Sequence, residues 1–133
     1  MLNLETKTRL ITAAQNGRAC AYAPYSNYPV SAALLTTTGK IFTGVNVENA
    51  AYPTTMCAER VAIFSAVTAG EQDFVAIVVM TDNGGSPCGS CRQVLAEFGL
   101  STIVIIINKD GDIIEETTVG ELLPGAFTPK DLL

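Results

Sequence analysis

The chain has 133 residues, 48% of them hydrophobic and 16% charged, which suffices for one domain, residues 1–133, with a real core. Its formal net charge is −5 and its eight Lys and Arg residues are scattered singly, so it lacks the basic stripe of nucleic-acid-binding proteins. Histidine is absent, which excludes His-based general bases, nucleophile activation and metal ligation within this chain.

The first third of the chain predicts one helix and one β-hairpin. Apolar residues recur with helical spacing from residue 4 to about 21. Pro24 and Pro29 then bracket an aromatic-rich loop. Residues 30–37 and 40–47 favour two strands, with Gly39 at the turn between them.

The rest of the chain alternates helices and strands. The predicted elements, in order, are a loop at 48–56, a helix at about 55–69, a strand at 74–80, a Gly-rich loop at 81–87, a helix at 88–98, strands at 102–107 and 112–118, and a short helix at 119–123. The strands at 74–80 and 102–107 are almost continuously apolar, which is typical of strands buried on both faces. We therefore predict an α/β fold with three layers, α/β/α, around a mixed five-stranded sheet.

No segment predicts a membrane span: the apolar stretch at 102–107 is far too short for one, and Asn108-Lys109-Asp110 follows it at once. The N-terminus carries Glu5 early and lacks the apolar region of a signal peptide. We therefore expect a cytoplasmic protein. Four cysteines in a reducing compartment favour metal binding or catalysis over disulfides.

Three of the cysteines have metal-ligand spacing. Cys57 stands two residues before Glu59, and Cys88 and Cys91 form a C-x-x-C pair after Pro87. Both segments lie where a loop enters a predicted helix, and a helix N-terminus stabilises a thiolate. Three protein ligands with a fourth position open are typical of catalytic Zn²⁺, whereas a structural zinc usually has four. We expect one Zn²⁺ held by these three sulfurs.

The residues beside the sulfurs indicate what such a metal would do. Glu59 is expected near the open position, where it would carry a proton from water to the substrate as the catalytic acid and base. Three thiolates outweigh the charge of Zn²⁺ and weaken its Lewis acidity. We expect Arg60, or as second choice Arg92, to donate hydrogen bonds to the sulfurs and restore it.

These motifs are similar to those of zinc nucleobase deaminases, whose pattern is H-x-E…P-C-x-x-C, with Cys57 in place of the histidine. The chain resembles the small, all-cysteine class of cytidine deaminases over nearly its whole length. The matching segments are Tyr22-Ala23-Pro24-Tyr25-Ser26 and Ala32-Ala33-Leu34, Gly44-Val45-Asn46-Val47-Glu48-Asn49-Ala50, Cys57-Ala58-Glu59-Arg60, Ser86-Pro87-Cys88-Gly89-Ser90-Cys91-Arg92-Gln93-Val94, and Glu121-Leu122-Leu123-Pro124.

The resemblance implies hydrolytic deamination of cytidine and 2′-deoxycytidine to uridine and 2′-deoxyuridine, with release of ammonia, in pyrimidine salvage. It implies that Asn46 and Glu48 bind the ribose 3′-hydroxyl, and that the backbone of Ala58 lies against the base edge. Glu59 would be the proton shuttle and would also contact the ring nitrogen.

The resemblance also assigns aromatic residues and an assembly. Tyr28 stands where the family usually has a Phe packed on the base, and its hydroxyl is a departure that can alter specificity. Tyr52 and Phe127 match aromatics that enter a neighbouring subunit's site, which implies a homotetramer with shared active sites. Ser31, where many members have Gly, is a second departure.

Other interpretations of the same residues stay open. Cys20 would be a fourth ligand if the zinc were structural, but we expect it to be a buried core thiol. Asn46 and Glu48 alternate as residues of an exposed strand end do, Tyr28 can be a packing residue, and Phe127 can pack only its own tail. A blasticidin-type deaminase and a non-catalytic zinc-binding module are the alternative functions.

Overall fold

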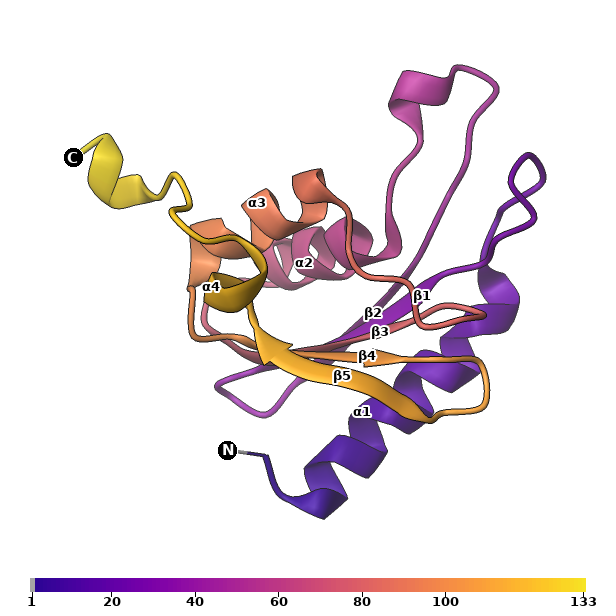
Figure 1. The fold of residues 1–133 in the computed structure, drawn as a ribbon, viewed down its shortest axis with the longest axis horizontal. Helices are drawn as coiled ribbons and strands as arrows, with labels where there is room; N and C mark the ends of the chain where they lie inside the picture. Colours follow the sequence, from indigo (N-terminus) through magenta and orange to yellow (C-terminus); the bar gives the residue numbers. More distant parts are fainter. Residues whose placement is uncertain (1) are drawn as a thin grey trace.

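The computed structural model describes residues 2–133 and contains a five-stranded sheet with the strand order β2-β1-β3-β4-β5 (Figure 1). The strands are β1 (Ser31–Thr36), β2 (Ile41–Val45), β3 (Phe74–Met80), β4 (Ile103–Ile107) and β5 (Ile113–Thr118). The helices are α1 (Leu4–Gly17), α2 (Ala58–Thr68), α3 (Gly89–Phe98) and the short α4 (Val119–Leu122). Three 3-10 turns lie between and after them: η1 (Arg18–Cys20), η2 (Tyr52–Thr54) and η3 (Pro129–Asp131).

The sheet is mixed, as the sequence predicted. β1 pairs antiparallel with β2 on one side and with β3 on the other, β3 pairs parallel with β4, and β4 pairs antiparallel with β5. Ser31, the first residue of β1, lies between Val45, the last residue of β2, and Met80, the last residue of β3. The carboxyl ends of β2 and β3 therefore meet at one edge of the sheet, where ligand sites of such folds commonly lie.

Side chains alternate between two cores, one on each face of the sheet. Ala32 and Leu34 of β1 pack in the core that contains residues of α2 and α3. Ala33 and Leu35 pack in the opposite core, with residues of α1. This alternation follows from the two-residue period of a strand. The predicted α/β/α layering is confirmed.

Both helices that carry the predicted ligands begin at a cysteine. Cys57 precedes α2 and Cys88 precedes α3, each with an extended backbone (ψ 150° and 169°). Neither N-cap side chain bonds the first turn of its helix. The unpaired N–H groups of two first turns therefore lie beside these sulfurs.

Gly44 sets how closely α2 approaches the sheet. A Cβ atom at this position would overlap the carbonyl oxygen of Ala58 and the amide nitrogen of Ala62, both in the backbone of α2. Only glycine allows this distance between β2 and the first turn of α2. The positions of Ala58 and Glu59 therefore depend on Gly44.

We expect Gly44→Ala to lower the free energy of unfolding by about 1–3 kcal/mol, because the helix backbone must move away from the strand. The midpoint of urea denaturation measures this change. Gly17→Ala is the matched control: Gly17 has helical angles (φ −77°, ψ −23°) and no neighbour would touch the added methyl group. It should stabilise the protein by about 0.5–1 kcal/mol. Equal midpoints for the two variants would contradict this account of Gly44.

The three largest differences from the sequence prediction concern the end of α1, the start of α2 and the C-terminal η3, while the other bounds differ by one or two residues at most. α1 ends at Gly17 and the chain continues in the tighter η1 turn, although the apolar pattern runs on to residue 21. α2 begins at Ala58 instead of about residue 55, because η2 occupies residues 52–54, with Pro53 fixing its start. η3 follows the expected elements and was not predicted.

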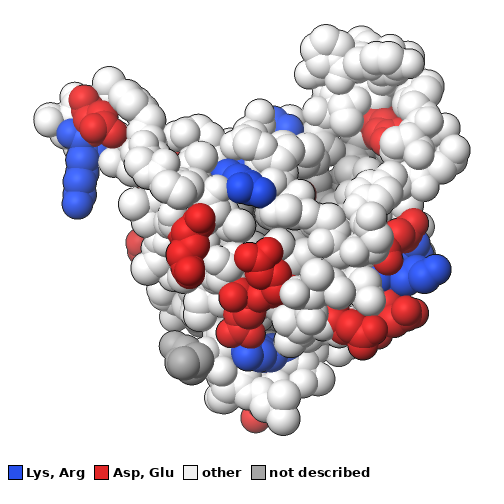
Figure 2. Space-filling view, viewed as in Figure 1, with Lys and Arg blue, Asp and Glu red and all other residues white. Residues whose placement is uncertain are grey.

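Charged residues are dispersed over the surface. Figure 2 shows Asp and Glu outnumbering Lys and Arg on the face drawn, with the basic residues set apart from one another. Within residues 2–133, every helix is too short or too polar to cross a lipid bilayer.

Candidate metal centre and pocket

The sulfurs of Cys57, Cys88 and Cys91 form one cluster. The Sγ atoms of Cys57 and Cys88 are 3.9 Å apart, those of Cys88 and Cys91 are 3.4 Å apart, and all three lie within 4.8 Å of one another. In a tetrahedral site with Zn–S bonds of about 2.3 Å, sulfurs are separated by about 3.8 Å. The donor set and its spacing therefore fit a Zn²⁺ ion.

Two helix ends hold these sulfurs together. Cys57 and Cys88 are the N-caps of α2 and α3, and Cys91 is the third residue of α3, fully buried beneath the first turn. Hydrogen bonding from Cys91, with further donation from Arg60 and Cys88, lowers the pKa of Cys57 to about 5. The same contact with Cys57, together with burial, raises the pKa of Cys91. Cys57 therefore ionises more readily than Cys91.

Arg60 is the basic residue that contacts the cluster. Its Nη2 donates to Sγ of Cys57 at 3.3 Å. Its Nε is buried and has no hydrogen-bond partner within residues 2–133, so the guanidinium retains a donor near the sulfurs. Arg92 was the alternative predicted donor to the sulfurs, but its guanidinium binds other groups. It donates to the backbone oxygens of Pro87 and Leu122 and to Oγ of Ser86. Arg92 therefore fixes the segment before α3.

Glu59 is the second residue of α2 and its side chain is only 4% exposed. Burial raises the pKa of Glu59 above its ordinary value, and the negative charge of Cys57 acts in the same direction. A carboxyl group in such surroundings binds a proton more readily than an exposed one, which suits a group that carries protons. The two-residue spacing from Cys57 is no obstacle, because both residues lie at the tip of the helix and face the same pocket.

A pocket of about 290 Å³ lies over this cluster, close to the lower end of the range for small-molecule sites. Residues from four parts of the chain line it: Ser26, Tyr28, Val30, Asn46, Glu48, Thr55, Met56, Cys57, Ala58, Glu59, Val79, Thr81, Gly85, Ser86 and Cys88. Seven residues singled out in the sequence are among them. Tyr52 and Phe127 are not: they are 73% and 55% exposed and lie outside this pocket.

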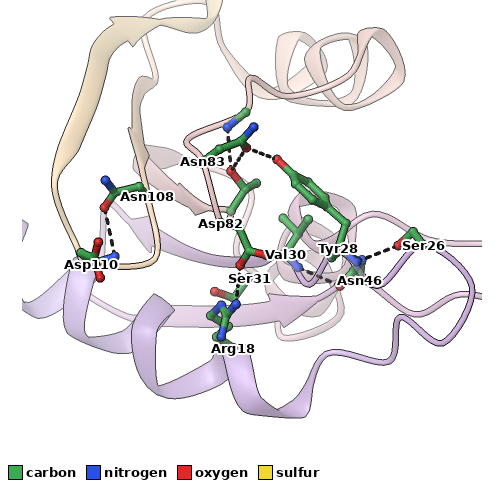
Figure 3. Close-up of polar contacts among 12 residues, drawn as sticks. Arg18, Ser26, Tyr28, Val30, Ser31, Asn46, Asp82, Asn83, Asn108 and Asp110 are labelled. Carbon is green, nitrogen blue, oxygen red and sulfur yellow. Dashed lines mark hydrogen bonds and ion pairs between the residues drawn. The ribbon is translucent and has the colours of Figure 1, made fainter.

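Asn46 fixes the wall of the pocket that contains Tyr28. Its Oδ1 accepts from the backbone N–H of Val30 at 2.9 Å, and its Nδ2 donates to the backbone oxygen of Tyr28 at 2.9 Å (Figure 3). Asn46 follows β2 directly and is buried, so the alternative interpretation that it is simply an exposed residue at a strand end is excluded. One N–H of its amide group is left for a ligand.

Glu48 organises the loop on the other side of Tyr28. Its Oε1 accepts from the backbone N–H groups of Tyr25 and Ser26, at 2.9 and 3.1 Å, and its Oε2 accepts from the hydroxyl of Ser26. The hydrogen bond from the Ser26 hydroxyl is the main reason that the pKa of Glu48 is lowered. Glu48 therefore remains an anion that can accept from a ligand hydroxyl.

The sequence interpretation of Cys20 was wrong. Cys20 lies in η1, is exposed, and does not belong to the sulfur cluster. The predicted helix would have buried it, but α1 ends three residues earlier. It is neither a core thiol nor a fourth ligand in this structure.

Several polar residues at or beside the pocket were missed, among them Ser26, Thr81 and Asn83. Ser26 belongs to the Tyr22-Ala23-Pro24-Tyr25-Ser26 motif, and its place in that motif was a signal that could have been used. In the structure its N–H and its hydroxyl both donate to the carboxylate of Glu48. Asn83 bonds the hydroxyl of Tyr28 from the loop before α3. Tyr28 and Asn83 are 55 positions apart, and no sequence pattern indicates that they contact each other.

The family model of the cytidine and deoxycytidylate deaminase zinc-binding region matches residues 4–107. The chain belongs to this deaminase family. The predicted resemblance is confirmed, and the zinc that the family's description names fits the three sulfurs. One zinc ion is therefore the cofactor of this deaminase fold.

Several known deaminases are similar to this chain over most of their length. A cytidine deaminase of Sporosarcina psychrophila is 52% identical over 127 residues, 93% of each chain. The crystal structure of cytidine deaminase from Burkholderia pseudomallei has a TM-score of 0.85 at 50% identity, covering 90% of this chain and 98% of that one. A blasticidin-S deaminase of Bacillus cereus is 34% identical, over 77% of this chain and 79% of its own.

Proposed function

We propose that the protein is a zinc-dependent cytidine deaminase that converts cytidine and 2′-deoxycytidine to the uridine products and ammonia. The observation that carries this proposal is one pocket that is lined by Glu59, by Cys57 and Cys88 of the sulfur cluster, and by Asn46 and Glu48. Membership of the deaminase family supports it. So do the similar proteins named cytidine deaminase.

Cys57, Cys88 and Cys91 would hold the zinc ion, which when bound supplies the Lewis acidity that activates a water molecule for attack on C4 of cytosine. Glu59 would take one proton from the water and deliver it to the ring nitrogen N3. It would then take the remaining proton from the new C4 hydroxyl and deliver it to the amino group, which leaves as ammonia when the C4–N bond breaks. Its burial suits this role, because a desolvated carboxyl binds a proton more readily than an exposed one. The backbone of Ala58, which lines the same pocket, would contact the base edge.

Asn46 and Glu48 would bind the ribose 3′-hydroxyl. The anionic Glu48 accepts from the hydroxyl, and the free N–H of Asn46 donates to its oxygen. Both side chains are already held by backbone groups of residues 25–30, so they are oriented before the substrate enters. Such preorganisation lowers the entropic cost of binding.

Arg60 would compensate the excess negative charge of three thiolates. We expect Arg60→Gln to lower kcat about 10- to 100-fold at full zinc occupancy, and to weaken zinc binding, because a donor to a ligand sulfur is lost. Turnover and competition with a chelator measure the two effects. Arg9→Gln, on the exposed face of α1, is the control. An unchanged rate and zinc affinity in Arg60→Gln would reject this role.

We further propose a homotetramer in which Tyr52 and Phe127 complete the sites of neighbouring subunits. Both aromatic side chains are exposed, and η2 and the C-terminal segment project from the body (Figure 1). Exposed aromatic side chains on projections are typical of contact residues. A mass of about four chains by sedimentation equilibrium, reduced when Phe127 is replaced by Ala, is expected; a monomer with full activity would contradict the proposal.

The biological setting is also a proposal. A single domain spanning residues 1–133 is supported by the two cores that share one sheet. A cytoplasmic role in pyrimidine salvage agrees with thiol ligands, which a reducing compartment preserves.

A panel of nucleosides assayed for ammonia release tests the proposed reaction. Cytidine and 2′-deoxycytidine are expected to be turned over, while blasticidin S and single-stranded polynucleotides are not. The acidic surface, with net charge −5, disfavours polynucleotides. Turnover of blasticidin S in place of cytidine would favour the other deaminase, and zinc without any turnover would indicate a non-catalytic module.

A further inference from the structure

The hydroxyl of Tyr28 ties one wall of the pocket to the loop that leads to the sulfur ligands. It donates to Oδ1 of Asn83 at 2.6 Å (Figure 3), an interaction termed the Tyr28–Asn83 bridge below. Thr81, at the carboxyl end of β3, supports this loop: its hydroxyl accepts from the N–H of Gly85 at 2.6 Å and lies 3.5 Å from the same Oδ1. The bridge therefore joins the loop of residue 28 to the loop of residue 83 beside the pocket, which Tyr28, Thr81 and Gly85 line.

Gly85 leaves the room that this bridge needs. A Cβ atom at position 85 would lie 2.6 Å from the hydroxyl oxygen of Tyr28, closer than unbonded atoms approach. The end of the Tyr28 ring thus lies directly against the backbone of the loop. Since Tyr28 and Gly85 both line the pocket, no gap separates the aromatic wall from the loop at this point.

The backbone around Tyr28 is fixed as well. Its N–H donates to Oγ of Ser26 at 3.0 Å and its carbonyl oxygen accepts from Asn46. The next wall residue, Val30, donates its N–H to Asn46. With its backbone and its hydroxyl both held, the ring of Tyr28 cannot retreat without breaking a hydrogen bond.

The proposed function places the cytosine ring against this wall, and the inference rests on that function. With C4 facing the sulfur cluster and N3 facing Glu59, the ring carbon C5 points away from Glu59. This orientation would turn C5 toward the Tyr28 wall and the loop, which contribute Tyr28, Thr81, Gly85 and Ser86 to the pocket lining.

We propose that the Tyr28–Asn83 bridge determines which substituents the enzyme accepts at C5 of the pyrimidine. The closed bridge excludes a methyl group at C5, because room for it requires Tyr28 and the loop to separate. Loss of the bridge lets the ring of Tyr28 move and admits the larger base. Asn83 acts as a positioning residue in this proposal, because it touches Tyr28 and not the substrate.

The test compares kcat/KM for cytidine with kcat/KM for 5-methylcytidine in four proteins: wild type, Tyr28→Phe, Asn83→Ala and Asn83→Asp. The ratio, which favours cytidine in the wild type, is expected to fall about three- to tenfold in Tyr28→Phe and Asn83→Ala, the typical effect of one neutral hydrogen bond. Asn83→Asp keeps an acceptor oxygen for the hydroxyl and is expected to retain the wild-type ratio.

Two variants serve as matched controls. Tyr22→Phe removes a hydroxyl outside the pocket lining. Asn108→Ala removes an amide whose oxygen accepts from the N–H groups of Asp110 and Asp112 in the turn before β5. Both are expected to leave the ratio unchanged. Zinc content and the urea midpoint, measured for every variant, show whether an altered ratio comes from an intact protein.

The outcomes separate this inference from the proposed function. Cytidine turnover with a ratio that stays within about twofold of wild type in Tyr28→Phe and Asn83→Ala overturns the inference alone. The inference is also overturned if the ratio falls as far in Asn83→Asp as in Asn83→Ala. The oxygen that accepts from the Tyr28 hydroxyl would then not matter. Absence of cytidine turnover by the wild type overturns the proposed function and the inference with it.

Discussion

Glu59→Gln is expected to lower kcat for cytidine by about 10²- to 10⁴-fold, the usual contribution of a general acid and base. Glutamine has nearly the same shape, so it fills the same buried position but cannot carry a proton. The zinc content should not change, because the cluster that can hold the metal consists of Cys57, Cys88 and Cys91. Ammonia release and metal analysis on the same preparation measure both quantities.

Glu97→Gln is the matched control for this variant. Glu97 is an exposed carboxylate on α3, and its replacement should change neither turnover nor zinc content. If Glu59→Gln kept more than about one tenth of the wild-type kcat at full zinc occupancy, Glu59 would not be the proton carrier.

Cys88→Ser is expected to remove zinc and turnover together. The Sγ atom of Cys88 lies 3.9 Å from that of Cys57 and 3.4 Å from that of Cys91, and serine is a poor ligand for Zn²⁺. The loss of zinc affinity should exceed the about 10- to 100-fold loss expected for a residue that only contacts a ligand. Competition with a chelator followed by metal analysis measures it.

Cys20→Ser is the control for loss of a thiol. Cys20 is exposed in η1 and outside the sulfur cluster, so zinc and turnover should both persist. Loss of zinc from Cys20→Ser, or full zinc in Cys88→Ser, would contradict the ligand assignment. Adding a strong chelator to the wild type should abolish turnover, and Zn²⁺ should restore it.

Much of the fold was predictable because its signals are local. The apolar run of β3 gave its bounds without error, and β4 and β5 differ from the prediction only at their first residue. The start of α2 was less predictable. The residues before it have a helical pattern, but Pro53 and the extended backbone of Cys57 interrupt it. Capping geometry of this kind depends on the tertiary position of the loop.

The candidate site was predictable to the extent that its chemistry is concentrated in short motifs. Cys57, Glu59, Cys88 and Cys91 were identified from spacing, and the structure brings the three sulfurs together. Asn46 and Glu48 needed the family resemblance, because their sequence pattern also suits an exposed strand end. The structure adds that both side chains hold the loop around Tyr28.

Contacts between distant segments were beyond the sequence. Arg60 and Arg92 each stand next to a metal-ligand motif, and only the fold shows that Arg60 contacts a sulfur whereas Arg92 binds backbone oxygens. The exposure of Cys20 depends on where α1 ends. The Tyr28–Asn83 bridge depends on the juxtaposition of two loops that meet at the edge of the sheet.

X-ray absorption at the zinc edge of the wild-type protein tests the central claim, a single zinc held by three sulfurs with one position left for chemistry. The account predicts three sulfur neighbours at about 2.3 Å and one lighter neighbour at about 2.0–2.2 Å, in protein that releases ammonia from cytidine. Four sulfur neighbours, and no lighter one, would show a closed structural site and contradict it.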